Sequence, residues 1–460
     1  MHKRRKQQKR KMIRKVIILV CSFIFFLAVL VCVKNIDKKE QTSVEDAIET
    51  EIREEAETSI DEDSVSLSDE KEDNRENEPA STELSDTTEP FNAEGEESAK
   101  LEREVMERLS EMTLEEKVAQ MFMITPEALT GYSQVTAAGD VTYQALKEYP
   151  VGGIIYFASN IIEPKQLKEM TQNMQEYAVE ISGIPMFLGI DEEGGMVTRI
   201  ARNNAFEVER FPNMWEIGKS GDLEYAYYVG ETIGAYLKDS GLNVDFAPDA
   251  DVLTNSGNKV IGERAFSDDA VLTAEMSVKV MQGLEAQSVY ACMKHFPGHG
   301  GTVGDTHQGY AYTERTIEEL RQEELVPFQY GIENGISFIM VSHIALPNVI
   351  GDETPASTSK HIVTDILRDE MGYEGIVITD AMNMGAVTTC YNSADGAVAA
   401  VLAGVDIVLM PSNFKAAYQG VIDAVANGEI QEERIDESVK RILRVKIEMM
   451  KNAEETMEQP

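Results

Sequence analysis

The sequence is poor in cysteine, with only four among its 460 residues. Cys21 and Cys32 stand in one apolar run near the amino terminus, whereas Cys292 and Cys390 are far apart. No CxxC pair and no Cys/His spacing typical of a metal finger occurs, which excludes a structural zinc site. A Cys292–Cys390 disulfide would suit an exported protein, but a cysteine inside an apolar run is more typical of a small core residue.

Positive charge is scarce beyond the first fifteen residues. The formal net charge is -39, yet nine of residues 1–15 are Lys or Arg. No basic stripe follows, so nucleic-acid binding is excluded as a function. Residues 34–100 are rich in Asp and Glu and poor in large apolar side chains, so they cannot bury enough surface to offset the entropy of ordering. We predict a disordered acidic linker there; a partner-binding acidic tail is the alternative.

One long apolar run interrupts this polar amino-terminal region. Residues 16–33, VIILVCSFIFFLAVLVCV, contain no charged side chain and are just long enough to span a bilayer as a helix. The basic residues 1–15 would stay in the cytoplasm, which would place the rest of the chain outside the cell membrane. A cleaved signal peptide is the alternative, but its apolar core is shorter and an A-x-A-like cleavage site is missing. We therefore expect a single-pass anchor at 16–33.

The remaining residues, 101–460, alternate short apolar runs with longer amphipathic ones. Such runs are typical of parallel strands covered on both faces. Eight of them, separated by helical stretches, predict an α/β fold of the (β/α)8 TIM-barrel type. An open doubly wound sheet is the alternative, but no GxGxxG motif opens a helix after the first run. The predicted strands are 120–125, 152–157, 186–191, 243–249, 290–296, 337–343, 375–380 and 406–411.

Polar residues follow five successive predicted strands. In a barrel of this type the carboxyl ends of the strands carry the chemistry. One such residue could be a satisfied core group, but five in a row are hard to explain by packing, because a buried charge is costly unless it is paired or used. The residues are Asp191 at the end of the third strand, Asp245, Asp249 and Asp251 at the end of the fourth, Lys294 and His295 at the end of the fifth, Ser342 and His343 at the end of the sixth, and Thr379 and Asp380 at the end of the seventh.

Asp380 and the loop pair Asp305–His307 suggest catalytic roles, each with a structural alternative. Asp380 could be a nucleophile or base that points into the mouth of the barrel, or it could cap the next helix. Asp305 and His307 stand two residues apart in a glycine-rich loop, as a carboxylate that orients an imidazole for acid/base catalysis would. The alternative for this pair is a loop aspartate that makes a turn beside an exposed histidine.

The stretch 294–310, KHFPGHGGTVGDTHQGY, contains three of the six histidines of the chain. Such a density raises the question of a metal site. His295 and His299 flank Phe-Pro-Gly, which breaks helical geometry, so they do not form an HxxxH pair on one helical face. The spacing matches no metal template, and we predict neither a metal nor a cofactor.

Five motifs together resemble glycoside hydrolase family 3, in particular its bacterial β-N-acetylhexosaminidases. They are IDEEGG, NVDFAPDADV, VIGERAF, KHFPGHGGTVGDTH and ITDAMNM, in this order over about residues 101–450. The resemblance implies a retaining hydrolase whose substrate is a carbohydrate with terminal N-acetylglucosamine, such as a peptidoglycan fragment. It implies that Asp380 is the nucleophile, that His307 is the general acid/base and that Asp305 is its partner. The glycines of the loop, Gly300, Gly301 and Gly304, would give it freedom to move.

The resemblance also implies a set of sugar-binding residues: Asp191, Arg199, Arg264, Lys294 and His295. For Arg199 and Arg264 a simple pairing with a structural acid is the alternative. His299 and His343 would support the loop and the strand ends.

Three positions depart from the pattern of the family: Met196 for Arg, Gly301 for Asp and Thr306 for Ser. A β-glucosidase of the same family and a non-catalytic wall-binding protein are the alternative functions.

Overall fold

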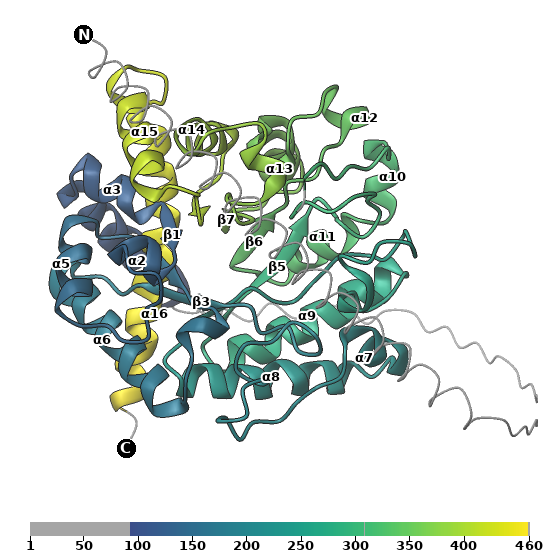
Figure 1. The fold of residues 1–460 in the computed structure, drawn as a ribbon, viewed down its shortest axis with the longest axis horizontal. Helices are drawn as coiled ribbons and strands as arrows, with labels where there is room; N and C mark the ends of the chain where they lie inside the picture. The colour runs from purple at the N-terminus through teal and green to yellow at the C-terminus, as the bar shows by residue number, and fades with distance from the viewer. Residues whose placement is uncertain (1–92, 308, 459–460) are drawn as a thin grey trace, which may run out of the picture. The chain divides into compact units, whose positions relative to one another are not determined.

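The computed structural model describes residues 93–307 and 309–458, in which eight parallel strands form one sheet in the order β7-β6-β5-β4-β3-β2-β1-β8 (Figure 1). This order follows the chain, as expected when each helix returns the chain to the start of the next strand. The strands are β1 (Phe122–Ile124), β2 (Gly153–Ile155), β3 (Phe187–Ile190), β4 (Val244–Asp245), β5 (Tyr290–Phe296), β6 (Phe338–Val341), β7 (Ile376–Thr379) and β8 (Val408–Leu409).

The sheet curls into a nearly closed barrel. β8 pairs with β1 at Phe122–Val408, and a parallel bridge between Ile378 and Ile407 joins its other side to β7. The Thr379 N–H donates to the Ile407 carbonyl at 3.0 Å across this last seam. An open doubly wound sheet would leave two unpaired edges, so that alternative is wrong and the predicted barrel-type fold is confirmed.

Helices surround the sheet, as the amphipathic stretches between the apolar runs predicted (Figure 1). Most of the longer helices bury an apolar face, and the strands are themselves buried on both faces. The helices are α2 (Ala93–Glu111), α3 (Leu114–Gln120), α4 (Pro126–Thr130), α5 (Asp140–Glu148), η1 (Ala158–Asn160), α6 (Pro164–Ser182), α7 (Met214–Ser220), α8 (Leu223–Asp239), η2 (Gly262–Arg264), α9 (Ala270–Ala286), α10 (Ile317–Gln322), α11 (Val326–Glu333), α12 (Pro347–Ile350), η3 (Ala356–Thr358), the π-helical η4 (His361–Glu370), α13 (Gly385–Thr388), α14 (Ser393–Ala403), α15 (Phe414–Ala426) and α16 (Glu432–Glu458).

The predicted strands have the right places, but most are too long. The fourth shows the difference best, since β4 ends at Asp245 whereas the apolar run suggested 243–249. Beyond Asp245 the chain stays extended beside β5: Asp249 and Lys294 form a parallel bridge, and the Ala250 N–H donates to the Lys294 carbonyl at 2.7 Å. This continuation carries Asp249 and Asp251 alongside the end of β5.

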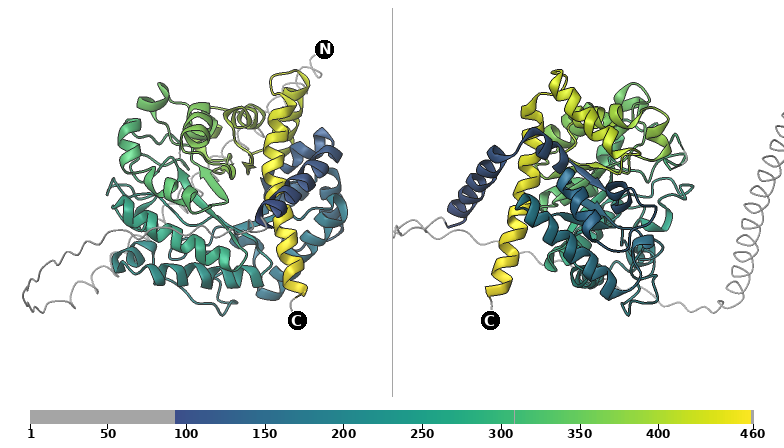
Figure 2. Two further views of the ribbon diagram at one scale, coloured as in Figure 1. Left: turned by 180° about the vertical axis from the view of Figure 1, so that it is seen from behind. Right: turned by 60° about the vertical axis from the view of Figure 1, so that its left-hand side comes forward.

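The first described helix begins earlier than the predicted start of the folded part at residue 101. α2 begins at Ala93, within the predicted linker 34–100, because AEGEESAK consists largely of good helix formers that extend the same helix. α2 lies beside α16 (Figure 2), where Glu102 pairs with Arg444 at 2.7 Å and Glu104 pairs with Lys451 at 3.2 Å. The predicted tail 1–15 and anchor 16–33 lie outside the described residues.

Two further predictions concern the cysteines and membrane-spanning helices. Both Cys292 and Cys390 are free; Cys292 is buried in β5, which confirms its interpretation as a small core residue, and Cys390 is exposed. Among residues 93–307 and 309–458, no helix combines the length and the apolar character needed to cross a membrane.

Candidate active site

Three of the predicted sugar-binding residues meet at the carboxyl ends of β3 and β5. Asp191 directly follows β3, and its carboxylate accepts hydrogen bonds from Lys294 Nζ at 3.1 Å and from Arg199 at 3.2 Å. Lys294 lies in β5, and Arg199 lies in the loop after β3. The side chains of Asp191 and Arg199 are each 19% exposed, so both reach solvent. Together they offer hydrogen-bond donors and acceptors to a polyhydroxyl ligand.

Glu193 joins this group to Arg264. Its buried carboxylate pairs with Lys294 and accepts hydrogen bonds from Arg264 at 2.8 and 2.9 Å. Arg264 also lies 3.2 Å from Asp249 Oδ2. Burial by itself would raise the pKa of Glu193, but Arg264 and Lys294 hold it well below its ordinary value. Both cations are therefore fixed by buried carboxylates, which lie deeper than the exposed edge of Asp191.

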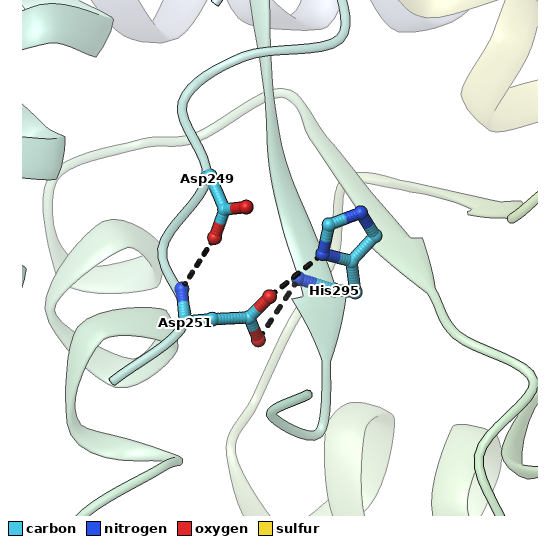
Figure 3. Close-up of side chains that lie close together, drawn as sticks. All are labelled: Asp249, Asp251 and His295. Carbon is cyan, nitrogen blue, oxygen red and sulfur yellow. Dashed lines mark hydrogen bonds and ion pairs between the residues drawn. The ribbon is translucent and has the colours of Figure 1, made fainter. Parts of the chain in front are cut away.

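His295 is held as a neutral imidazole with a defined tautomer. Its Nδ1 lies 2.7 Å from Asp251 Oδ2 (Figure 3), and its Nε2 lies 3.3 Å from a nitrogen of Arg264. An ionised carboxylate only accepts and a guanidinium only donates, so Nδ1 carries the proton and Nε2 accepts. Burial first, and Arg264 second, lower the pKa of His295 to about 4. Both ring nitrogens thus have protein partners, and His295 helps to hold Arg264 in place.

Asp249, Asp251 and His295 also form the one grouping in the described part of the chain with the donor atoms of a metal site, all within 4.8 Å of one another (Figure 3). Three such ligands are the number found in open zinc sites. Here Asp251 accepts from His295, however, and Asp249 is paired with Arg264. Because each donor already has a partner, we assign the three side chains to the charge network around Arg264.

Glu192 fixes the loop that carries Arg199. Its fully buried carboxylate accepts hydrogen bonds from the backbone N–H groups of residues 199, 200 and 201 and from the Tyr236 hydroxyl. The Glu192 N–H in turn donates to Asp245 Oδ1 at 2.9 Å. Burial, together with the nearby Glu192 charge, raises the pKa of Asp245 well above its ordinary value.

His299 anchors the base of the loop after β5. Its backbone N–H donates to Asp251, its Nδ1 lies 2.8 Å from Thr302 Oγ1, and its Nε2 lies 3.4 Å from Thr306 Oγ1. Burial lowers its pKa to about 4. The expectation that His299 supports the loop agrees with these contacts.

Two glycines of this loop, Gly300 and Gly301, lie in close contact with neighbouring segments. A Cβ on Gly300 would lie 1.9 Å from the Val252 carbonyl oxygen, so no other residue fits there. A Cβ on Gly301 would lie 2.8 Å from Glu324 Oε1 and 2.7 Å from Thr254 Oγ1. The presence of Gly301 in place of the family's Asp thus has a structural explanation. The buried Glu324 carboxylate, which pairs with Arg315, occupies the space beside this glycine.

Asp305 and His307 contact each other at the exposed end of the loop. Asp305 Oδ1 lies 3.0 Å from His307 Nδ1 and also accepts the His307 backbone N–H at 2.9 Å. The two interpretations of this pair therefore coexist, since one carboxylate both makes the turn and orients the imidazole. Nδ1 carries the proton that faces Asp305, which leaves Nε2 free of this contact. The His307 side chain is 65% exposed.

Asp380 directly follows β7 and is half-buried. Its Oδ1 accepts the Ala381 N–H at 2.7 Å. Burial by itself would raise the pKa of Asp380, but the neighbouring imidazoles of His343 and His295, with the Ala381 amide and the Lys294 cation, hold it below its ordinary value. The carboxylate is ionised at neutral pH. The helix-capping alternative is wrong, because the next helix, α13, has its N-cap at Met384.

The two candidate catalytic elements are tied together through the backbone. The Ala386 N–H, after Asp380, donates to the carbonyl of Thr306, between Asp305 and His307, at 3.1 Å. His343 lies under Asp380: its Nε2 donates to the Ala381 carbonyl at 3.1 Å, and its Nδ1 lies 2.7 Å from Ser357 Oγ. These hydrogen bonds fix the position of the His307 loop relative to the end of β7.

In the structure, the predicted residues form two groups whose members contact one another. One group lies around Lys294 and Arg264, and the other is the pair Asp305–His307. Sequence reasoning missed the carboxylates that fix the first group, Glu192 and Glu193, and named Asp251 only as a strand-end residue. The signal was present, since two acids follow Asp191 directly in IDEEGG. Of the departures, Met196 is exposed on the rim, and Thr306 is buried against His299.

Comparison with known proteins agrees with this geometry. Residues 113–445 match the Glycosyl hydrolase family 3 N terminal domain. A beta-hexosaminidase A of Pseudoalteromonas piscicida is 33% identical over 331 residues, which are 66% of this chain and 55% of that protein. A beta-hexosaminidase of Xylella fastidiosa (strain M23) is 34% identical over 271 residues, 58% of this chain and 77% of that protein.

Solved structures give the same result. A family 3 beta-N-acetylglucosaminidase from Paenibacillus sp. str. FPU-7 shares 37% identity with a TM-score of 0.70, over 74% of this chain and 63% of the other. A family 3 glycosyl hydrolase from Mycobacterium smegmatis shares 28% identity with a TM-score of 0.65, over 74% and 98%. The chain thus spans between about half and nearly all of the relatives that it matches. With the family match covering most of its length, this chain belongs to glycosyl hydrolase family 3.

Proposed function

We propose that this protein is a retaining exo-β-N-acetylglucosaminidase that releases terminal N-acetylglucosamine through a glycosyl–Asp380 intermediate. One observation carries the proposal: an ionised carboxylate at the end of β7 and a His–Asp pair on the loop after β5 belong to two segments that a backbone hydrogen bond joins. The names of the relatives, beta-hexosaminidase and beta-N-acetylglucosaminidase, support the choice of sugar.

In the first step, a carboxylate oxygen of Asp380 forms a bond to the anomeric carbon while the bond to the leaving oxygen breaks. That oxygen takes a proton from Nε2 of the His307 imidazolium, whose Nδ1–H remains with Asp305. In the second step, neutral His307 takes a proton from water, whose oxygen attacks the anomeric carbon and releases Asp380. Each step conserves charge without a cofactor.

The first group of side chains binds the sugar in this proposal. Asp191 accepts from sugar hydroxyls, and Arg199 and Lys294 donate to the ring substituents. Arg264 and His295 already have protein partners in Glu193 and Asp251, through which they hold these donors in position. This division differs from the sequence-based expectation, in which all five side chains contact the sugar.

An assay of the full chain on 4-nitrophenyl β-N-acetylglucosaminide and on the matching β-glucoside tests the function. We expect preference for the acetamido sugar, and Asp380→Asn should lower kcat roughly ten thousandfold, because the amide is a far poorer nucleophile. A glucoside preference would favour the β-glucosidase alternative. No hydrolysis of either substrate would favour the wall-binding alternative, and an active Asp380→Asn would reject the site.

We further propose that the natural substrates are peptidoglycan fragments outside the cell, reached by a domain tethered at 16–33. The long uncharged run after a basic tail supports the tether. Membrane fractionation of the full chain and of a 34–460 version tests it. Release of N-acetylglucosamine from muropeptides, compared with chitin fragments of equal length, tests the substrate.

A further inference from the structure

The loop that carries His307 also carries an exposed apolar face. Val303 and Tyr312 form an antiparallel bridge, with reciprocal hydrogen bonds of 2.9 and 3.0 Å. Side chains of directly paired residues lie on the same face, and so do those of residues two apart along a strand. Val303, Tyr310 and Tyr312 therefore share one face, which we name the loop platform.

The platform is apolar and exposed, although apolar side chains of this size are usually covered. Val303 is 56% exposed and Tyr310 is 47% exposed. The rings of Tyr310 and Tyr312 are stacked, with centroids 5.3 Å apart and planes 21° from parallel. Stacked tyrosines present a flat surface whose ring faces suit the apolar C–H face of a pyranose.

The backbone holds the platform rigid. Besides the bridge to Val303, Tyr312 forms a parallel bridge with Ala345 in the loop after β6. The Thr313 N–H donates to the Ala345 carbonyl at 3.1 Å, and the Ala345 N–H donates to the Ala311 carbonyl at 2.9 Å. A surface fixed in this way loses little conformational entropy when a ligand binds.

The position of the platform tells which part of a substrate it would meet. His307 stands at the turn between the two paired arms, where the Gly309 N–H donates to the Asp305 carbonyl at 3.0 Å. A general acid lies on the side of the leaving group, because it protonates the glycosidic oxygen. We propose that the loop platform binds the sugar on the leaving-group side of the cleaved bond, so that the preferred substrates are oligosaccharides. This proposal rests on the proposed function.

Two substrates with alkyl leaving groups isolate the effect in the full chain: the β-1,4-linked disaccharide of N-acetylglucosamine and methyl β-N-acetylglucosaminide. Only the first has a sugar to stack on the platform. We expect Tyr310→Ala to lower the ratio of their kcat/KM values about three- to tenfold, mainly through KM of the disaccharide. Tyr310→Phe, which keeps the ring, should retain the ratio. Tyr330→Ala, an exposed tyrosine in α11, is the matched control.

The outcomes separate this proposal from the function on which it rests. If the unmodified protein cleaves neither substrate, the proposed function fails. If it cleaves both and Tyr310→Ala leaves the ratio unchanged, or lowers both values equally, the platform does not bind the leaving-group sugar. The platform proposal is equally rejected if Tyr330→Ala changes the ratio as strongly, or if Tyr310→Phe does so.

Discussion

The end of β5 and the loop that follows it form two parts with opposite character. In the first, residues 294–302, which we call the buried anchor, the charged and imidazole side chains have protein partners, and both histidines are neutral. In the second, residues 303–312, which we call the exposed tip, His307 and Tyr310 face solvent. The difference shows that burial separates the histidines of this stretch into those of a scaffold, in the buried anchor, and one at a reactive end, in the exposed tip. Mutations in the two parts should therefore fail in different ways.

His307→Ala in the exposed tip tests the reactive end. We expect kcat/KM on methyl β-N-acetylglucosaminide to fall about 10²- to 10⁴-fold, because its leaving alkoxide needs the proton. The free energy of unfolding should change by less than about 0.5 kcal/mol, since the side chain is largely exposed. Steady-state kinetics and urea unfolding measure the two effects. A large loss of stability would contradict the division between tip and anchor.

Arg264→Leu tests the scaffold, where we expect a loss of stability. Glu193 and Asp249 would stay buried without their shared cation, so the free energy of unfolding should fall by about 3–5 kcal/mol. Arg202→Leu, which removes an exposed arginine from the β3 loop, is the matched control and should cost less than about 0.5 kcal/mol. Equal stability of the two variants in urea unfolding would mean that the buried network does not hold the scaffold.

His295→Asn tests the neutral state of the anchor. The folded pKa of His295 is about 4, below the ordinary 6.5, so the unfolded chain takes up the proton first as the pH falls. The contribution of His295 to stability is therefore complete above about pH 6.5 and is lost between pH 6.5 and 4, by about 3 kcal/mol. Asparagine keeps an N–H toward Asp251 but does not titrate.

The destabilisation caused by His295→Asn should consequently be smaller at pH 4.5 than at pH 7.5. The difference between variant and wild type is the informative quantity, because burial and Asp251 raise the pKa of neighbouring Asp249 to about 7, and its titration acts in the opposite sense. Urea unfolding at both pH values measures it. An equal destabilisation at the two pH values would show that His295 is not held neutral.

Gly301→Asp tests the border between anchor and tip, with the smallest effect. The new side chain would meet Thr254 and the Glu324 carboxylate at less than 3.0 Å, so we expect a cost of about 1–3 kcal/mol in the free energy of unfolding. Adding Glu324→Gln should recover part of it, because the repulsion between carboxylates disappears. A double variant no more stable than Gly301→Asp would assign the whole cost to space rather than charge.

Much of the architecture could be predicted from the sequence, because continuous apolar runs that alternate with amphipathic stretches leave few folds other than a barrel. Strand ends were less predictable. The sequence predicts a strand over 243–249, but only Val244–Asp245 pair regularly, and the chain then continues beside β5, where Asp249 bridges Lys294. Helix α2 likewise begins in a stretch whose composition alone suggested disorder.

The candidate site was predictable in its location rather than in its internal order. The rule that chemistry follows the carboxyl ends of barrel strands selected Asp191, Lys294 and Asp380. It did not distinguish side chains that face solvent from those that hold others in place. Glu193 was missed for this reason, since its role depends on Arg264, which lies 71 positions away along the chain.

The sequence by itself determined which residues stand at the strand ends, because apolar periodicity is a local property of the chain. The order of these runs along the chain then predicted a barrel that brings the strand ends to one face. Only the tertiary structure decided which histidine is neutral and which faces solvent. Protonation depends on burial and on charges that distant segments contribute, and in KHFPGHGGTVGDTH those charges come from Asp251, Arg264 and the loop's own Asp305.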